Sequence, residues 1–278
     1  MADLHKRLLV AAIGIPLCAG VVYAGGWFFA LGLGLLSTIA FWEFAGMFEN
    51  KDRVVFLNAG AGAAAMYPLA VLFFGFAGGS IYGGLLVVGI AVYSIRRLPP
   101  SAGPISAASL TLFGVFYTGA LLAFGVLLRE GFKDGHGRLS ETLFFFYPIL
   151  ITWGVDTGAY FIGRFFGRRR MAPLISPNKT IAGLVGALVA GPLCGLLGLW
   201  ILPLNGLHPS VGLTLLFGFI IAVAAVAGDL VESAMKRECE VKDASTLLPG
   251  HGGVLDRLDS LLFTIPAAYV FFTIVALV

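Results

Sequence analysis

Charged side chains are scarce in this sequence. Only 12% of its 278 residues are Asp, Glu, Lys or Arg, whereas 59% are hydrophobic. Soluble globular proteins carry roughly 25% charged residues, and a water-soluble domain of this size could not bury so much apolar surface. The composition therefore excludes a cytosolic globular protein, a secreted disulfide scaffold and a disordered chain.

Cysteine and the common soluble catalytic motifs are also missing or sparse. Cys18, Cys194 and Cys239 form no Cys-x-x-Cys pair and are odd in number, which argues against a disulfide framework or a cysteine-based zinc site. The sequence contains no Walker A, protein-kinase or Gly-x-Ser-x-Gly motif. ATP handling by a standard soluble module is therefore excluded.

Long apolar segments are what the sequence has instead, and its mean hydropathy is +0.95. Segments near 20 residues can cross about 30 Å of hydrocarbon as helices, and they are too long and uniform for strands of an outer-membrane barrel. We predict an all-α polytopic membrane protein with about nine transmembrane helices. Their approximate ranges are 8–23, 27–48, 55–76, 80–95, 105–128, 143–162, 181–202, 211–235 and 260–278. The first two helices, and the third and fourth, are each expected to form a tight hairpin.

The basic residues are distributed asymmetrically over the loops. When the N-terminus is placed in the cytoplasm and the helices alternate in direction, 15 of the 18 Lys and Arg fall in inner segments. Only Arg129, Lys133 and Arg138 fall in outer segments. The positive-inside rule then predicts a cytoplasmic N-terminus and an outer C-terminus. A missed helix would swap all later loops, so this asymmetry also supports the helix count.

Two parts of the chain differ in their polar residues. Residues 1–142 hold five predicted helices and an outer loop. These helices contain almost no charged residues, and Glu43 is the exception. Residues 143–278 hold four helices and are predicted to carry the catalytic site. Most of the 38 glycines are interpreted as helix-packing positions, as in Gly191-x-x-x-Gly195.

Two carboxylates lie within predicted helices, where ionisable groups are costly and mark function or pairing. Asp156 is in the middle of one apolar segment, and Asp229 is in another. Helical spacing places Asp229 on one face with Glu232 or Ser233 and with Lys236 or Arg237. For this helix alone, the simpler interpretation is an ion pair within the helix that neutralises Asp229.

More charges follow at 242–259. Asp256 and Asp259 are three residues apart and can face one side of a helix start. Carboxylates gathered with Lys and Arg suit a site for phosphate groups and a divalent metal such as Mg²⁺.

Gly252 and Gly253 would allow backbone N–H groups to approach an anion, although a turn explains them equally well. His251 could be structural, bind phosphate or donate a proton.

The loop 164–180 offers a second place for an anion. Ser176 or Thr180 can cap the helix that follows, and Lys179 lies beside its N-terminus, where an anion is favoured. The run Arg168–Arg170 is interpreted mainly as a topology signal with attraction to anionic lipid headgroups.

Segment 233–259 resembles the signature of the phosphatidate cytidylyltransferases, also called CDP-diacylglycerol synthases. It reads Ser233-Ala-Met-Lys-Arg, then Lys242-Asp243-x-Ser, then Leu-Pro-x-His-Gly-Gly-Val-x-Asp-Arg-Leu-Asp259. The resemblance extends to Asp156, to Ser176-Pro-x-Lys-Thr180 and to Gly228-Asp229. It therefore covers about residues 150–278, whereas the N-terminal half matches only in length and hydrophobicity.

One position departs from the family pattern. Ala182 stands where the family usually has Glu before Gly183. The missing carboxylate must be dispensable or supplied by another group, for which Asp156 and Glu232 are candidates.

The resemblance implies transfer of CMP from CTP to phosphatidate, which gives CDP-diacylglycerol and pyrophosphate for phospholipid synthesis. The phosphate monoester is itself the nucleophile, so the protein supplies positioning and charge neutralisation. Mg²⁺, with room for a second cation, is the implied cofactor. The implied partners are CTP, phosphatidate and membrane lipids, with a homodimer as a family-level expectation and no nucleic acid. The site would lie on the cytoplasmic side of a bacterial inner membrane.

The resemblance also implies roles for individual residues. Metal ligands are expected at Asp229, Asp256, Asp259 and Asp156. Catalytic roles are expected for Asp229, Asp256, Lys236, Arg237 and His251. Substrate binding is expected at Ser176, Lys179, Thr180, Ser233, Lys242, Asp243, Gly252, Gly253 and Arg257.

Two alternatives remain open at this point. Another CTP-using membrane lipid transferase, such as a polyprenol kinase or an archaeal-lipid cytidylyltransferase, would use a similar charged face with a different acceptor. An ion-coupled transporter would use Asp156 and Asp229 along an ion path, but the charges concentrate on one side of the membrane.

Overall fold

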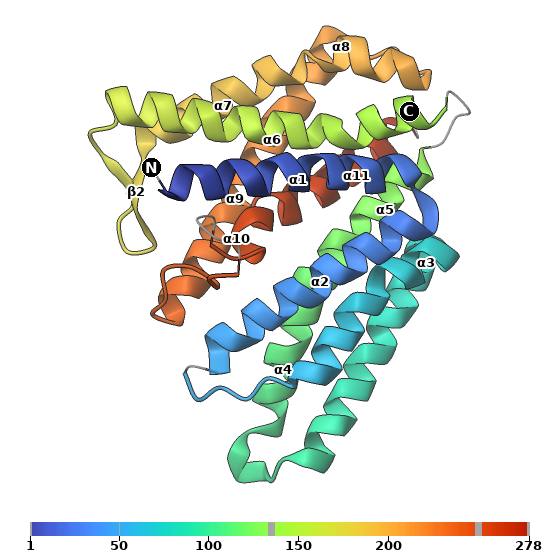
Figure 1. Ribbon diagram of the computed structural model, residues 1–278, viewed down its shortest axis with the longest axis vertical. Helices are drawn as coiled ribbons and strands as arrows, with labels where there is room; N and C mark the ends of the chain where they lie inside the picture. Colours follow the sequence, from blue (N-terminus) through green and yellow to red (C-terminus); the bar gives the residue numbers. More distant parts are fainter. Residues whose placement is uncertain (1, 50, 133–136, 248–251, 277–278) are drawn as a thin grey trace. The chain divides into compact units, whose positions relative to one another are not determined.

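A computed structural model describes residues 2–49, 51–132, 137–247 and 252–276 (Figure 1). The elements are α1 (Ala2–Ala24), α2 (Gly26–Glu49), α3 (Leu57–Arg97), η1 (Pro100–Ala102), α4 (Pro104–Val115), η2 (Phe116–Ala120), α5 (Leu121–Gly131), α6 (Arg138–Phe166), β1 (Arg170–Ala172), β2 (Ser176–Thr180), α7 (Ile181–Gly195), α8 (Gly198–Ile201), η3 (Leu202–Asn205), α9 (Val211–Glu238), α10 (Leu255–Leu258) and α11 (Leu261–Ala276). Of the η elements, η2 is a π-helix and the others are 3₁₀-helices. The strands β1 and β2 form one antiparallel hairpin.

Six helical stretches in the described part of the chain are long and apolar enough to cross a membrane. They are Gly26–Glu49, Leu57–Arg97, Pro104–Gly131, Ile181–Leu204, Val211–Glu238 and Leu255–Val275. Large apolar side chains are exposed on these and neighbouring helices; Phe28, Phe74 and Trp200 are 71%, 73% and 73% exposed. Lipid accommodates such surfaces and water does not. The prediction of an all-α membrane protein is confirmed, whereas the count of nine helices is not.

The third and fourth predicted helices form the single element α3. Gly75 interrupts it with a φ of 63°, in the left-handed region that glycine adopts readily. The chain then folds back, because the Tyr82 hydroxyl donates to the Ala63 carbonyl at 3.0 Å. A straight helix would separate two residues this far apart in sequence by about 28 Å. The tight hairpin predicted for this pair is therefore confirmed.

The chain forms two compact units. The first comprises the residues up to Glu130 together with Cys239–Arg257, and the second comprises Gly131–Glu238 together with Leu258–Val278.

Helices α2, α3, α4 and η2 pack against one another in the first unit. Phe41 and Phe44 are fully buried there. A Cβ atom on Gly119 would lie 2.9 Å from the Ala64 Cα, so only glycine permits this approach of the helices. Membrane helices gain van der Waals contact in this way, because lipid provides no hydrophobic drive between them.

The turn between α1 and α2 is held by polar contacts from the end of α5. Arg129 is buried and its Nε donates to the Val22 carbonyl at 3.0 Å. Glu130 accepts a hydrogen bond from the Gly26 backbone N–H at 2.8 Å. These contacts satisfy backbone groups at the helix ends, which would be costly to leave unpaired in a membrane.

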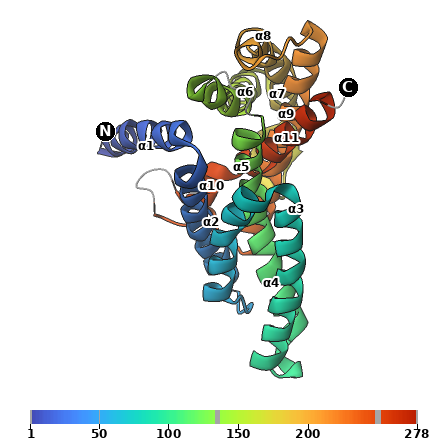
Figure 2. The same cartoon turned by 90° about the vertical axis from the view of Figure 1, so that its right-hand side faces the viewer.

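Helices α6, α7, α9 and α11 form the second unit. Helices α6 and α7 lie side by side in both views (Figures 1 and 2). A Cβ atom on Gly186 would lie 2.6 Å from the Gly158 carbonyl oxygen, and one on Gly191 would lie 2.5 Å from the Gly218 carbonyl oxygen. At these two positions the glycines serve helix packing, as the interpretation of most glycines in the sequence expects.

Candidate functional site

A cavity of about 760 Å³ lies in the second unit. Its walls come from α6, the β-hairpin with the residues that precede it, the start of α7, and α9. The charged residues that line it are Asp156, Arg164, Arg170, Lys179 and Asp229. This volume is in the usual range for sites that bind small molecules and cofactors.

The β-hairpin and the helix that follows it position Lys179. Thr180 pairs with Arg170 across the hairpin, and its side-chain oxygen accepts a hydrogen bond from the Gly183 N–H at 3.1 Å. Thr180 is thus the N-cap of α7, which selects it over Ser176 among the two predicted caps. Lys179 directly precedes this fixed residue and is therefore held at the start of α7.

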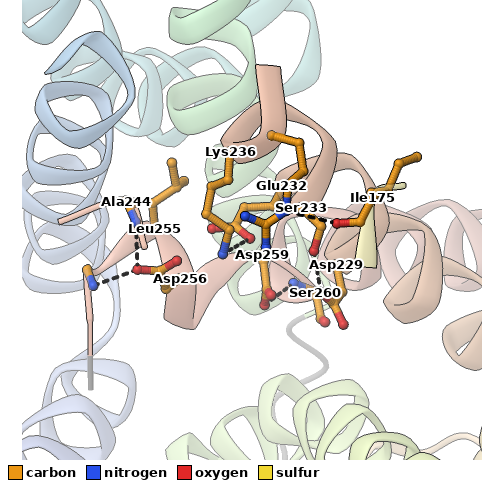
Figure 3. A network of polar contacts seen from close by, with 12 residues as sticks. Ile175, Asp229, Glu232, Ser233, Lys236, Ala244, Leu255, Asp256, Asp259 and Ser260 are labelled. Carbon is orange, nitrogen blue, oxygen red and sulfur yellow. Dashed lines mark hydrogen bonds and ion pairs between the residues drawn. The ribbon is translucent and has the colours of Figure 1, made fainter. Parts of the chain in front are cut away.

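Lys179 supplies the counter-charge for Asp229. Its Nζ lies 2.6 Å from the Asp229 carboxylate, and the two side chains are 23% and 35% exposed. The Ser233 hydroxyl donates to the other Asp229 oxygen at 3.3 Å (Figure 3). A cation thus reaches Asp229 from the hairpin, some 50 residues earlier in the chain.

The simpler interpretation considered for this helix alone, an ion pair between Asp229 and a cation of its own helix, does not apply, because Asp229 pairs with Lys179. The Lys236 Nζ lies 2.5 Å from Glu232, and the Arg237 Nε donates to the Ile175 carbonyl at 3.2 Å (Figure 3). Arg237 therefore ties α9 to the hairpin that carries Lys179. The helical face predicted for α9 is present, with its charges paired differently.

Three carboxylates of the second unit converge. One oxygen each of Asp229, Glu232 and Asp259 lies within 4.8 Å of the other two. Gly228 allows this, because a Cβ atom there would lie 2.5 Å from the Asp259 backbone oxygen. Oxygen ligands at this spacing are the chemistry that Mg²⁺ and Ca²⁺ prefer, so the donor set fits a divalent metal.

The predicted metal ligands are thus partly assembled within this unit. Asp229 and Asp259 belong to the carboxylate cluster, and Asp156 lines the cavity together with Asp229. Glu232, which is fully buried, was predicted only as a substitute for the missing family Glu. The sequence placed it on the Asp229 face but did not show that it approaches Asp259.

Asp256 belongs to the first unit and holds its own loop. Its Oδ2 accepts hydrogen bonds from the backbone N–H of Ala244 at 3.0 Å and of Gly253 at 2.7 Å (Figure 3). Gly252 has a φ of 81°, and a Cβ atom there would lie 2.8 Å from the same oxygen. Both facts require glycine at position 252. His251 lies outside the described residues.

Glu43 is a residue to which the sequence analysis gave no role. It is 7% exposed, and its carboxylate accepts hydrogen bonds from Val254 N at 2.9 Å, Leu255 N at 2.7 Å and the Ser245 hydroxyl at 2.6 Å. A Cβ atom on Gly253 would lie 2.7 Å from it. The signal in the sequence was a single carboxylate in an otherwise uncharged helix.

The backbone N–H groups of residues 253–255 therefore face carboxylates within the first unit. Binding of phosphate by Gly252 and Gly253 stays a prediction.

The model of the cytidylyltransferase family matches residues 5–275. The chain belongs to this family. Relatives named phosphatidate cytidylyltransferase include that of Synechocystis sp., 33% identical over 297 residues that cover 96% of this chain and 95% of the relative. That of Staphylococcus epidermidis is 33% identical over 266 residues (94% and 95%), and that of Bacillus subtilis 29% over 273 residues (97% and 97%).

The cytidylyltransferase match reaches the N-terminal half, which the sequence analysis had compared only by length and hydrophobicity. The family resemblance noted for residues 150–278 is therefore confirmed and extended, and it now includes the α2 helix that carries Glu43.

The predicted site residues are distributed over both units of this cytidylyltransferase. Those lining the cavity are Asp156, Ser176, Lys179, Thr180 and Asp229. The others in the second unit are Ser233, Lys236, Arg237 and Asp259, and those in the first are Lys242, Asp243, Gly252, Gly253, Asp256 and Arg257. The polar residues that line the cavity without a prediction of substrate binding include Tyr160, Arg164, Arg170 and Asn178.

Proposed function

We propose that this protein transfers CMP from CTP to phosphatidate and releases pyrophosphate. The observation that carries the proposal is the pairing of Lys179 with Asp229 in the cavity, with Asp259 beside Asp229. Such a combination of carboxylates and cations suits phosphates and a divalent metal. The names of the relatives supply the substrate class.

The proposed reaction needs no nucleophile from the protein. A phosphate oxygen of phosphatidate attacks the α-phosphorus of CTP, so one P–O–P bond forms and the bond from the α-phosphorus to the leaving pyrophosphate breaks. The chain contributes orientation of the two phosphates and neutralisation of their charge, in which we assign Lys179 to the nucleotide.

We propose Mg²⁺ as the cofactor, held by Asp229 and Asp259, with Glu232 and Asp156 as neighbouring carboxylates. When bound, the metal would neutralise phosphate charge and polarise phosphoryl oxygens. A role for Asp256 as a further ligand stays a prediction from the family signature, as do the roles of Lys242, Arg257 and His251, and a homodimer stays a prediction too.

We further propose that the hairpin and segment 242–259 face the cytoplasm of a bacterial cell. The asymmetry of the basic residues supports this orientation, and CTP is a cytosolic substrate.

The decisive experiment uses purified protein in detergent with phosphatidate, Mg²⁺ and CTP labelled at either its α- or its γ-phosphate. We expect the α-label to appear in the lipid and the γ-label in pyrophosphate. Label from the γ-position in the lipid would indicate a kinase and overturn the proposal.

Transfer to an archaeal-type lipid or a polyprenyl phosphate, with none to phosphatidate, would also overturn it. The Asp229→Asn variant is the matched control, because it keeps the shape of the side chain and removes its charge.

A further inference from the structure

Two arginines line the same cavity without a counter-charge. Arg164 is in the last turn of α6, and Arg170 begins β1. Neither has a carboxylate partner among the residues that the structure describes. Lys179, by contrast, is paired with Asp229. With Asp156 and Asp229 set against Arg164, Arg170 and Lys179, the lining keeps an excess of one positive charge, which an anionic ligand would neutralise.

The Arg164 side chain and the Arg170 backbone are each held by their surroundings. The Arg164 guanidinium donates to the Tyr160 hydroxyl at 2.5 Å and lies 5.8 Å from the centre of that ring. Tyr160 itself lines the cavity. The backbone of Arg170 pairs with Thr180, the residue that caps α7, so the point from which its exposed side chain extends is fixed. A planar guanidinium can bind phosphate through two parallel hydrogen bonds.

The surface next to Arg164 is apolar. Phe161, Phe165 and Phe166 on α6 are 50%, 71% and 69% exposed, and the rings of Phe161 and Phe165 stack. Exposed phenylalanine rings of this kind suit contact with acyl chains at a membrane. A phosphate bound at Arg164 would thus lie where the polar cavity meets lipid, which suits a phosphate attached to acyl chains and not the phosphates of free CTP.

We propose that Arg164 and Arg170 form the subsite for the phosphate monoester of the lipid acceptor, while Lys179 and Asp229 serve the nucleotide. The inference rests on the proposed function. A phosphate monoester carries a charge of about −1.5 to −2 at neutral pH, which two guanidinium groups match.

Steady-state kinetics with each substrate varied in turn test the subsite. We expect Arg164→Gln and Arg170→Gln each to raise the KM for phosphatidate at least tenfold and to change the KM for CTP less than twofold. The matching lysine variants should show an intermediate effect, because they keep the charge and lose the second hydrogen bond. Arg169→Gln is the control, since Arg169 is exposed beside Arg170 and does not line the cavity; it should change either KM less than twofold.

An unchanged KM for phosphatidate in both glutamine variants, or an equal rise in the KM for CTP, would overturn the subsite. A second measurement does not require turnover: a short-chain phosphatidate alone should raise the melting temperature of the wild-type protein and not that of the double glutamine variant. If phosphatidate stabilises both equally, the subsite is refuted even when the enzyme is active. If it stabilises only the wild type but no CDP-diacylglycerol forms, the proposed reaction fails and the subsite stands. The lysine variants serve both measurements if a glutamine variant does not fold.

Discussion

Replacing Glu43 with Gln should release the loop that carries Asp256. Glu43 accepts hydrogen bonds from Val254 N, Leu255 N and the Ser245 hydroxyl through its two carboxylate oxygens. Glutamine keeps the size of the side chain but offers one acceptor oxygen, and its amide N–H₂ would face a backbone N–H. One buried donor then loses its acceptor.

The magnitude follows from these three contacts. A hydrogen bond to a charged group contributes about 1.5–3 kcal/mol against about 1 kcal/mol for a neutral one, and a buried donor left unsatisfied costs about 1–3 kcal/mol. We therefore expect Glu43→Gln to lower the free energy of unfolding by about 3 kcal/mol, which corresponds to a melting temperature roughly 6–12 °C lower for a chain of this size. Ser245→Ala removes one of these three bonds, together with the exposed bond from Leu247 N to the Ser245 hydroxyl, and should cost less, about 1.5 kcal/mol.

The assay combines thermal unfolding with amide hydrogen exchange. Exchange should accelerate at Val254 and Leu255 in Glu43→Gln and change less in Ser245→Ala. Because Asp256 directly follows these residues, we also expect a lower kcat and a higher Mg²⁺ requirement, with a smaller change in the KM for phosphatidate. A Glu43→Gln protein that melts with the wild type and keeps slow exchange at both amides would refute the reasoning.

Four further predictions concern the second unit. In a double-mutant cycle, Lys179→Met and Asp229→Asn should each lower kcat about a hundredfold or more, and the double variant should be no more active than either single variant. If the double variant regained activity, the pair would serve only to neutralise each other's charge in the fold. Ala182→Glu should change the Mg²⁺ requirement and kcat less than about twofold. Residue 182 faces away from the cavity, because it lies about 150° around the axis of α7 from the mean direction of the α7 residues that line the cavity. A large gain in metal affinity, measured by Mg²⁺ titration, would contradict this. Thr180→Val should lower the free energy of unfolding by about 1 kcal/mol through loss of the α7 cap, which a shift in melting temperature would report, and an unchanged melting temperature would argue against the cap. In a cysteine-free background, Leu174→Cys at the hairpin, where Leu174 is 91% exposed, should react with an impermeant thiol reagent only from the cytoplasmic side; reaction from outside in intact cells would reverse the proposed orientation.

Local properties of the chain were readable from its residues. Apolar segments of about 20 residues indicate membrane helices because hydrocarbon thickness sets the required length. The face shared by Asp229, Glu232 and Ser233 follows from the period of the α-helix, and the cap at Thr180 involves only the next three residues. The signature in 233–259 is linear and therefore identifies the family without a fold. The number of membrane helices was less accessible, because the segments predicted at 8–23 and 143–162 are not among the six long apolar stretches of the described residues; the fold-back of α3 at Gly75, by contrast, was predicted as a hairpin.

Contacts between distant segments were decided by the tertiary structure alone. The cation that pairs with Asp229 is Lys179 of the hairpin, although Lys236 on the same helix was nearer in sequence. Glu43 meets Val254 some 200 residues later. Such partners depend on distance in space and not in sequence, because the attraction between a cation and a carboxylate weakens with their separation and an unpaired charge is costly within a membrane. The run Arg168–Arg170 is a further example. The sequence does not distinguish its three arginines, whereas in the structure the pairing of β1 with β2 places Arg170 in the lining of the cavity.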